Sequence, residues 1–412
     1  MNITFCKNCF YSTKHPLGLT IDDTSGICSG CLVHNEKYQI NWEHKFNKLK
    51  KIVKEYKSKK NFYDCIVPVT GSQDSFFILY TVKKLGLNPL LVSYNHYFNT
   101  DIGIKNLSNL KTTFDCDLLT LNVNPKKVKK ITKHTLINYG NMYWPAIAGK
   151  TVFPVQIAHK YKIPLIIWGA HQGLEQVGMF SHNHEVEMSR WYRKNHDLFG
   201  VEAEDIIKTD GLVTEGDIIE YLYPDDKDLN AIGVRGVYLG NYIKWDVKSQ
   251  QELMISKFKY QSIPFRRTID TYDYSDCFNY MNIHDLLKLY KHGYSKVTDH
   301  MTREIRYNRV TKQQGLKIIK KYENKKPQFT SLFSKWLNID ERSLEFVLNR
   351  FRSKNYWKKT DINKWRFNGW SSQNKNKNKK DDLNLYKKLI FKNNNKINEK
   401  RYITVGKGWP PK

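Results

Sequence analysis

The chain of 412 residues carries 68 Lys and Arg against 40 Asp and Glu, and it is long enough for two or more domains with a buried core. It has no run of about 18 apolar residues and starts without the basic and apolar segments of a signal peptide, so we expect a cytoplasmic protein without a membrane span. The net charge of +28 comes mostly from Lys and accompanies abundant Asn, Ile and Tyr, which favours codon bias and a solvated basic tail over a nucleic-acid-binding surface.

Two pairs of cysteines lie in the first forty residues, a segment with few other apolar side chains. Two residues separate the members of each pair and 18 residues separate the pairs, so four thiolates can surround one ion tetrahedrally. Free cysteines or a redox pair are the alternatives. Because so small a unit gains folding energy from a metal, we predict a structural Zn2+ site in a unit spanning residues 1–40. Its predicted ligands are Cys6, Cys9, Cys28 and Cys31.

Helices and strands are expected to alternate in a unit spanning residues 41–216. Four apolar, β-branched segments lack polar alternation, which is typical of strands buried on both faces of a parallel sheet. The sequence therefore predicts the α/β class with an open parallel sheet, in which ligands bind at the carboxyl ends of the strands. The predicted strands are 64–70, 89–94, 117–123 and 163–169, and the predicted helices are 41–59, 75–86, 102–114 and part of one at 154–161.

Three further segments complete the predicted organisation. Residues 217–327 are rich in aromatic side chains and are expected to be helical. Residues 328–370 are expected to form a small helical cap around an apolar core of Leu332, Trp336, Leu337, Leu344, Val347, Leu348 and Phe351. Residues 371–412 form the basic tail, whose low-complexity runs cannot bury enough apolar surface to fold.

A glycine-containing turn joins the first predicted strand to the following helix. Its backbone amides and those of the first helical turn make an anion site suited to pyrophosphate. Its hydroxyls add donors, and Asp74 can cap the turn or position Mg2+. No Gly-Lys-Ser/Thr follows, so the turn is not a Walker loop, and an ordinary capped turn is the alternative. The residues of this loop are Thr70, Gly71, Ser72, Gln73, Asp74 and Ser75.

This strand, loop and helix resemble the SGGxDS loop of the PP-loop ATP pyrophosphatases. Other segments narrow the resemblance to the N-acetyl sugar amidotransferase family, which makes acetamidino sugars for lipopolysaccharide or for nonulosonic acids such as pseudaminic acid. Besides the cysteine pairs, the similar segments are WGAHQGLEQVG from Trp168, GVRGVYLGNYIKWD from Gly233, HGYSKVTDHMTREIRYNRVT from His292 and FRSKNYWKK from Phe351. The resemblance covers residues 4–368. Ser72 replaces the second loop glycine of the family, and a positive φ there would be strained.

The resemblance implies an ATP-dependent, AMP-forming carbon–nitrogen ligase. In such an enzyme AMP is transferred onto the oxygen of the sugar's N-acetyl group, and ammonia then displaces AMP and leaves an acetamidino group. The resemblance also implies Mg2+ and a separate glutaminase with a cyclase-like subunit. The sequence agrees, because none of the three remaining cysteines has the context of a glutaminase nucleophile.

The same resemblance carries roles to individual residues. The region 217–327 is expected to bind substrate and phosphate. Lys296 and Arg306, with Arg309, are expected to stabilise phosphate charge, and Asp299 and His300 to bind substrate or handle the proton of ammonia. Nucleotide contacts outside the loop are expected from Ser93 and Tyr94 near the adenosine, from Gly169, and from Glu175, which orients Mg2+ or substrate. The predicted catalytic set is Asp74, Lys296, Asp299, His300 and Arg306.

Simpler interpretations exist for most of these residues. Exposed charges or helix-packing pairs explain the charged set, and core packing explains the aromatic residues Trp168, Tyr238, Tyr242 and Trp245, which otherwise stack on a sugar or base. For the whole chain, the alternatives are a PP-loop enzyme of tRNA modification and a non-catalytic zinc-knuckle protein that binds nucleic acid. The sequence does not name the sugar or its carrier.

Overall fold

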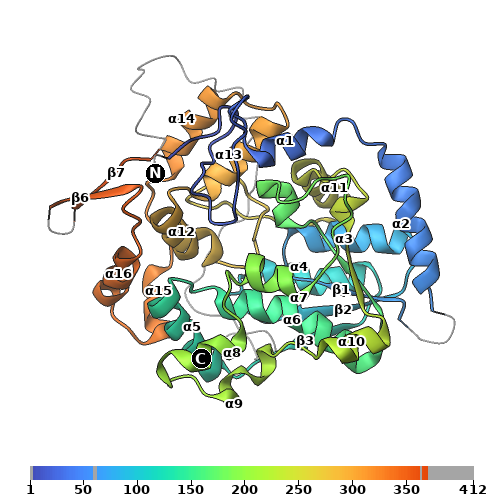
Figure 1. Ribbon diagram of the computed structural model, residues 1–412. Helices are drawn as coiled ribbons and strands as arrows, with labels where there is room; N and C mark the ends of the chain where they lie inside the picture. Colours follow the sequence, from blue (N-terminus) through green and yellow to red (C-terminus); the bar gives the residue numbers. More distant parts are fainter. Residues whose placement is uncertain (1–2, 59–62, 362–363, 370–412) are drawn as a thin grey trace.

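The computed structural model of the protein describes residues 3–58, 63–361 and 364–369 (Figure 1). The predicted basic tail and the last residue of the helix predicted at 41–59 lie outside the described residues. Figure 1 shows a central sheet with helices on both of its sides, and a mainly helical C-terminal region that lies beside the N-terminal segment.

Five parallel strands form the central sheet, in the order β3-β2-β1-β4-β5. Their bounds in this order are Leu118–Leu121, Pro89–Tyr94, Cys65–Pro68, Leu165–Trp168 and Arg235–Tyr238. The predicted α/β class with an open parallel sheet is confirmed, and all four predicted strands are present. The chain leaves β1 toward one edge of the sheet and β4 toward the other. The carboxyl ends of these two neighbouring strands therefore mark the crevice where open α/β sheets bind ligands.

Apolar side chains of the strands pack on both faces of the sheet, which explains their unbroken apolar sequence. Cys65 and Val67 belong to one buried cluster, whereas Ile66 and Val92 belong to another on the opposite face. The helices that contribute to the first cluster are α2 (Trp42–Tyr56), α3 (Gln73–Lys84), α4 (Asp101–Thr113) and α11 (Val247–Phe258). Those that contribute to the second are α6 (Trp144–Tyr161) and α10 (Asp226–Ile232).

The fifth strand lies in a region that the sequence predicted to be helical. β5 follows α10 and pairs in parallel with β4, from Leu165 opposite Arg235 to Trp168 opposite Tyr238. It is only four residues long and contains Gly236, so its apolar pattern is too short to identify it as a strand. The α/β unit therefore extends past the boundary predicted at residue 216.

The remaining helices lie around the sheet layers. α1 (Ser29–Glu36) belongs to the N-terminal unit, and the helices that follow β3 and β4 in the chain are α5 (Pro125–Tyr139), α7 (Arg190–Tyr192), α8 (Ala203–Asp210) and α9 (Glu215–Ile218). The C-terminal helices are α12 (Asp285–His292), α13 (Lys296–Arg306) and α14 (Lys312–Tyr322). A capping box at Ser295 and Thr298 fixes the start of α13, which becomes important at the site.

The segment 328–370 is helical only in part. α15 (Thr330–Leu337) and α16 (Glu341–Arg350) agree with the prediction, but an antiparallel hairpin of β6 (Trp357–Asp361) and β7 (Lys364–Phe367) follows them. Of the predicted core, Leu337, Leu344 and Leu348 are buried, and they share one cluster with Phe98. The cap is therefore packed on the α/β unit, and long-range contacts rather than local periodicity complete its core.

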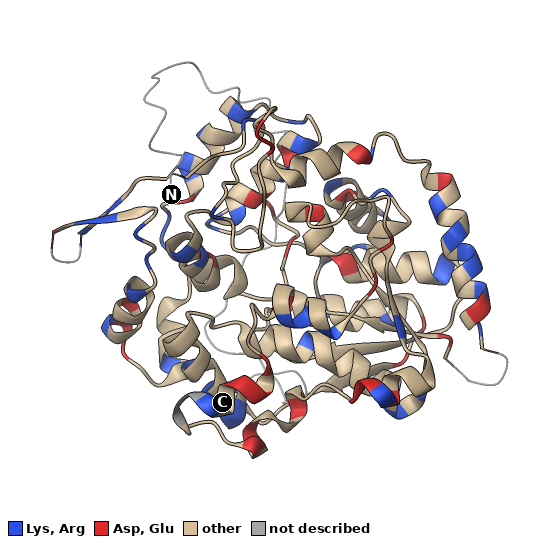
Figure 2. Ribbon diagram, in the orientation of Figure 1, with Lys and Arg blue, Asp and Glu red and all other residues tan. Residues whose placement is uncertain are grey.

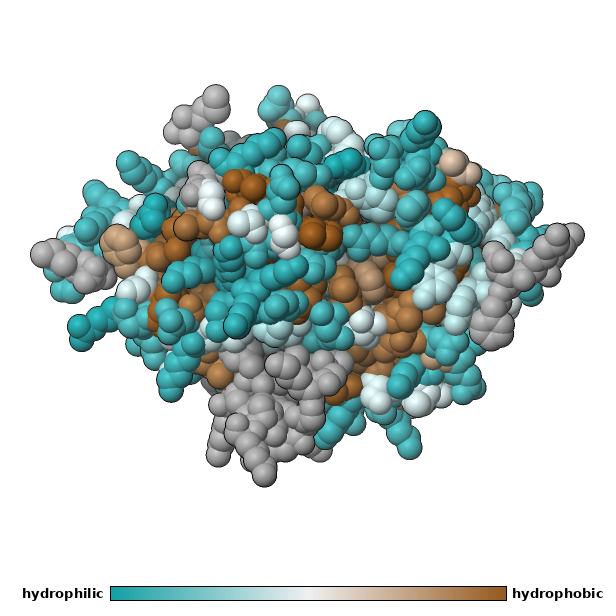
Figure 3. Space-filling view, turned by 90° about the horizontal axis from the view of Figure 1, so that it is seen from below, coloured by the Kyte–Doolittle hydropathy of each residue, from teal (hydrophilic) through white to brown (hydrophobic). Residues whose placement is uncertain are grey.

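The described surface is mixed in charge and polarity. Figure 2 shows Lys and Arg distributed over many elements, including a series along α2, with Asp and Glu among them. In the view from below, apolar side chains form several groups among hydrophilic ones (Figure 3). Among the described residues, none of the helices combines the length and the apolar character needed to cross a bilayer.

Candidate active site and metal centre

A cavity of about 370 Å3 lies at the carboxyl ends of β1 and β4, the position that the sheet topology predicts. Three segments far apart in the sequence line it: the loop after β1, the loop after β4, and the helix α13. Of the predicted site residues it contains Thr70, Ser72, Asp74, Ser75, Tyr94, Gly169, Glu175, Lys296, Asp299, His300 and Arg306.

The loop after β1 is held by its own hydroxyls. Thr70 N donates to Ser75 Oγ at 2.9 Å, and Ser72 N donates to Thr70 Oγ1 at 3.1 Å. Ser72 is the N-cap residue of α3, but its side chain does not cap the helix, so the amides of the first turn remain available to an anion. The φ of Ser72 is −108°, which any residue adopts. The expected strain at this departure from the family pattern is therefore absent.

Gly71, not Ser72, is the loop position at which a side chain cannot fit. A Cβ at Gly71 would lie 1.9 Å from the carbonyl oxygen of Gly103 in α4. Because that neighbour is backbone, α4 would have to move away from the loop.

We expect Gly71→Ala to destabilise the protein by about 2–3 kcal/mol, as other overpacked sites do. Ser72→Gly is the matched variant, and it is expected to cost no more than about 1 kcal/mol because the φ of Ser72 is already favourable for any residue. Chemical denaturation of both variants tests this. A cost for Ser72→Gly as large as that for Gly71→Ala would contradict the assignment.

The loop after β4 contains Glu175 in the short helical turn Gly173–Val177. Lys37, only 1% exposed, forms an ion pair with Glu175 Oε2 at 2.5 Å and donates to the carbonyl of Trp245 at 3.0 Å. The other carboxylate oxygen of Glu175 is buried without a partner in the described structure. The N-terminal unit thus holds the loop that carries the predicted acidic residue.

Gly169, just after β4, lines the cavity, and a Cβ there would lie 3.1 Å from Ile78 Cδ1.

One face of α13 forms the wall opposite these loops. Lys296 and Asp299 are one turn apart, with Lys296 Nζ 3.8 Å from Asp299 Oδ2. The other partners of Asp299 are Lys288, Tyr11 Oη, which donates at 2.8 Å, and Gln176 Nε2, which donates at 3.2 Å. The predicted residues of α13 therefore face the same cavity as the loop after β1. Asp299 is also bound to α12, to the N-terminal unit and to the loop after β4.

Burial and neighbouring charges shift the pKa values of the site carboxylates in opposite directions. Burial, followed by the Asp273 carboxylate, raises the pKa of Asp74 to about 7. Burial also acts to raise the pKa of Asp299, but Lys288 and Lys296 outweigh it and lower that pKa to about 2. Although burial lowers the pKa of Lys296, Tyr280 and Asp299 bring it above its usual value. At neutral pH Lys296 and Asp299 are both charged and form an ion pair, whereas the raised pKa of Asp74 favours its protonated form more than that of an ordinary carboxyl group.

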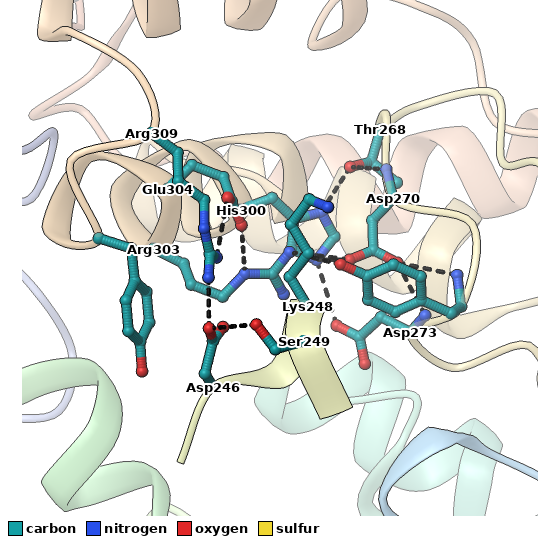
Figure 4. A network of polar contacts seen from close by, with 12 residues as sticks. Asp246, Lys248, Ser249, Thr268, Asp270, Asp273, His300, Arg303, Glu304 and Arg309 are labelled. Atoms are coloured by element: carbon teal, nitrogen blue, oxygen red, sulfur yellow. Dashed lines mark hydrogen bonds and ion pairs between the residues drawn. The ribbon is translucent and has the colours of Figure 1, made fainter. Parts of the chain in front are cut away.

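His300 lines the cavity and belongs to a buried polar network (Figure 4). Its Nε2 lies 3.1 Å from Asp273 Oδ2, and its Nδ1 is hydrogen-bonded to Thr268 Oγ1 at 2.5 Å. Arg303 donates to Asp270 Oδ2 at 3.0 Å. Polar atoms of Asp270, Asp273 and His300 lie within 4.8 Å of one another, a spacing that could hold a cation. The guanidinium of Arg303 already balances this charge, which favours an ion-pair network.

The four cysteines of the N-terminal unit come together as predicted. They are between 0% and 1% exposed, and their sulfur atoms lie within 4.8 Å of one another, with Cys9 Sγ 3.5 Å from Cys28 Sγ. Four thiolates at about 2.3 Å from a tetrahedral zinc ion lie about 3.8 Å apart, so the spacing fits a closed structural site. Such an ion would stabilise the unit and would take no part in the chemistry of the cavity.

Arg306 links this metal centre to the cavity. Its Nε lies 3.4 Å from Cys31 Sγ, and its Nη1 donates to the carbonyl of Glu175 at 2.9 Å. A guanidinium beside thiolates offsets part of their negative charge. Arg306 also lines the cavity, so these contacts hold its side chain between the cysteine cluster and the loop after β4, and the predicted phosphate contact stays a prediction.

Three other predicted contacts stay predictions. Arg309 lies outside the cavity lining and forms ion pairs with Asp246 and with Glu304 (Figure 4). Ser93 lines a smaller neighbouring cavity that it shares with Gly71. Tyr94 reaches the main cavity, but its hydroxyl is hydrogen-bonded to that of Tyr221 at 2.7 Å, as in a packed core.

The predicted aromatic residues include one that lies only in the core and three that line the cavity. Tyr242 is fully buried in the core of the sheet. Trp245 belongs to the same buried cluster but also lines the cavity, as Trp168 and Tyr238 do. Stacking on a sugar or base therefore remains open only to the last three.

Sequence reasoning missed several cavity residues. Arg303 was within the family-like segment and falls on the face of α13 that carries Lys296 and Asp299, so helical spacing could have identified it. Lys150 and Asp273 also line the cavity, but they come from a helix and a loop that carry no motif. Only the folded chain brings those two residues to the site.

A comparison with known families found a match to the part of the chain that contains α13, one wall of this cavity. Residues 254–370 match the model of a family described as LPS biosynthesis protein WbpG-like, C-terminal domain. The matched segment includes Asp273 and the whole of α13. The similarity supports a role in the biosynthesis of lipopolysaccharide (LPS) sugars. No curated protein gave a significant match to the chain.

Proposed function

We propose that this protein is an ATP-dependent amidotransferase of the PP-loop type, which converts the N-acetyl group of a sugar into an acetamidino group. One observation carries the proposal. The uncapped N-terminus of α3 and its loop share a single cavity with the cation–carboxylate wall of α13, which lies in the segment that matches an LPS biosynthesis family. An anion site and a set of acid–base groups are what adenylyl transfer followed by amine attack requires.

The proposed reaction has two balanced steps. The amide oxygen of the N-acetyl group attacks the α-phosphorus of ATP, the bond to pyrophosphate breaks, and an adenylylated imidate forms. Ammonia then adds to the imidate carbon, a proton is lost, and AMP leaves with the former amide oxygen. The amidine nitrogen therefore comes from ammonia, and the oxygen of the acetyl group ends on AMP.

The residues of the chain supply positioning and charge for these steps. The first-turn amides of α3 would hold the pyrophosphate portion, and Lys296 would offset phosphate charge from the opposite wall. Asp74 and Glu175, each with one buried carboxylate oxygen without a partner, are the residues that would hold Mg2+. The bound ion would neutralise phosphate charge in the site.

His300 is the group we propose for the proton of ammonia. It lines the cavity and is held by Thr268 and by Asp273, so its ring has a fixed orientation. Asp299, bound to Lys288 and Tyr11, would instead keep Lys296 in place.

The ammonia is proposed to come from a separate glutaminase. Burial raises the pKa of Cys277 to about 11, and it also raises the pKa values of Cys65 and Cys116 above the usual range of a thiol. A glutaminase of the cysteine type needs a reactive thiolate, and these three cysteines lack one at neutral pH.

The first test is a direct assay. Purified full-length protein is incubated with ATP, Mg2+, ammonium and a panel of free and nucleotide-linked N-acetyl sugars, and AMP and sugar products are followed by mass spectrometry. We expect AMP only with one class of sugar, together with a product in which an NH group replaces an oxygen atom. AMP formation with tRNA but with no sugar would overturn the proposal in favour of RNA modification.

A further inference from the structure

A second cavity, of about 150 Å3, lies beside the first at the carboxyl ends of β4 and β5. Trp168, Gln172 and Tyr238 line both cavities, so one wall separates them. Arg193, Asp197 and Tyr223 line only the second cavity. None of these three belongs to the loop after β1 or to α13.

Two hydrogen-bond donors of this cavity have no acceptor in the described structure. Arg193 is 4% exposed; its Nε donates to Thr151 Oγ1 at 3.1 Å, its Nη1 pairs with Glu202, and its Nη2 has no partner. The indole N–H of Trp168 is likewise buried and without a partner. Glu202 Oε1, in the same ion pair as Arg193, is also buried without a partner. Buried polar groups are normally satisfied, so this set fits a ligand that offers both donors and acceptors.

The charges around the second cavity favour a neutral ligand. Glu202 offsets the guanidinium of Arg193, and Asp197 adds a carboxylate to the lining. Burial lowers the pKa of His171 to about 4, so that ring is neutral at pH 7, and burial raises the pKa of Tyr223 to about 12. A phosphate or carboxylate ligand would meet no net positive charge here, whereas hydroxyls can both donate to Asp197 and accept from Arg193.

We infer that this second cavity binds the pyranose ring of the acceptor sugar, between the buried donors Arg193 and Trp168 and the aromatic side chains of Tyr223 and Tyr238. The inference rests on the proposed function, because it assumes an acetamido sugar as substrate. Because Trp168, Gln172 and Tyr238 line both cavities, the two are adjacent, and the inference places the ring hydroxyls in the second cavity and the acetamido group on the side of the main cavity. Aromatic faces and a few directed polar groups are the usual composition of such ligand sites.

The test compares Arg193→Lys with Arg190→Lys. Lys at position 193 keeps a cation beside Glu202 and loses the free donor, whereas Arg190 lies over the same Tyr223 ring but pairs with Glu204 outside the cavity. Wild type and variants are titrated calorimetrically with N-acetylglucosamine, N-acetylmannosamine and their uridine-diphosphate forms, and separately with ATP. We expect Arg193→Lys to raise the sugar Kd about tenfold or more, as for loss of a hydrogen bond to a charged group, with the ATP Kd unchanged. Arg190→Lys should change neither.

Trp168→Phe is the second variant, and it tests sugar binding in the second cavity if Arg193→Lys proves unstable. It removes the unpartnered N–H and keeps an aromatic ring, so we expect weaker sugar binding together with an equal or higher Tm of the free protein. Sugar binding by both variants as tight as that of wild type would overturn this inference and leave the proposed function standing. No binding of any acetamido sugar to wild type would overturn both.

Discussion

Replacing Asp74 by Asn is expected to lower the rate of AMP formation by about two to three orders of magnitude, the usual effect of removing one charge-stabilising group from a polar site. Asp74 lies in the first turn of α3, at the junction between the anion-binding amides and the α13 wall. One of its carboxylate oxygens is buried without a partner, so the substitution disturbs few contacts within the protein. ATP binding should weaken most in the presence of Mg2+.

The same substitution should change the pH dependence of stability. Because the folded pKa of Asp74 is raised to about 7, above the value in the unfolded chain, its ionisation costs stability as pH rises from about 4 to about 7. Asp74→Asn removes this cost, so the variant should gain Tm relative to wild type at about pH 8 and show little gain at about pH 4. Asp101→Asn, in the first turn of the neighbouring α4, is the matched control, since Asp101 does not line the cavity. AMP formation at the wild-type rate by Asp74→Asn would contradict the assigned role.

Replacing Cys28 by Ser is expected to release the bound metal and to disorder the cavity as well as the N-terminal unit. The sulfur atoms are buried, and loss of one ligand leaves three thiolates beside Arg306 without their ion. The unit also supports the loop after β4: Ser29 Oγ donates to the carbonyl of Val177 at 2.6 Å, and Lys37 holds Glu175. Both contacts depend on the position of α1.

Elemental analysis and thermal denaturation measure this effect. We expect one zinc ion per chain in wild type, little in Cys28→Ser, and a fall in Tm large enough to prevent ATP binding at physiological temperature. Cys116→Ser is the control, because Cys116 is part of the α/β core and not of the cluster. Full metal content in Cys28→Ser, or an unchanged Tm after treatment with a chelator, would contradict a structural metal centre.

Local patterns in the sequence were sufficient for part of the molecule. The four cysteines could be identified as one ligand set because their spacing is a local property that the fold then preserves. The strands β1 to β4 could be identified because burial on both faces demands an unbroken apolar run. The loop at Gly71 followed from its place between such a strand and a helix. The sequence did not identify β5, because its four residues include a glycine and are too few to show a pattern. They become a strand by pairing with β4.

The sequence by itself thus determined the four cysteines that could hold a metal ion, the class of the fold and the end of the sheet at which the cavity lies. Only the tertiary structure decided which charged residues face that end. Helical periodicity places Lys296, Asp299 and Arg303 on one face of α13, but it does not say what that face meets. Arg306, on the same helix, contacts the sulfur atom of Cys31, and Arg309 forms an ion pair with Asp246. The physical reason is that the energy of a buried charge depends on partners from distant segments, and chain packing alone brings those partners together.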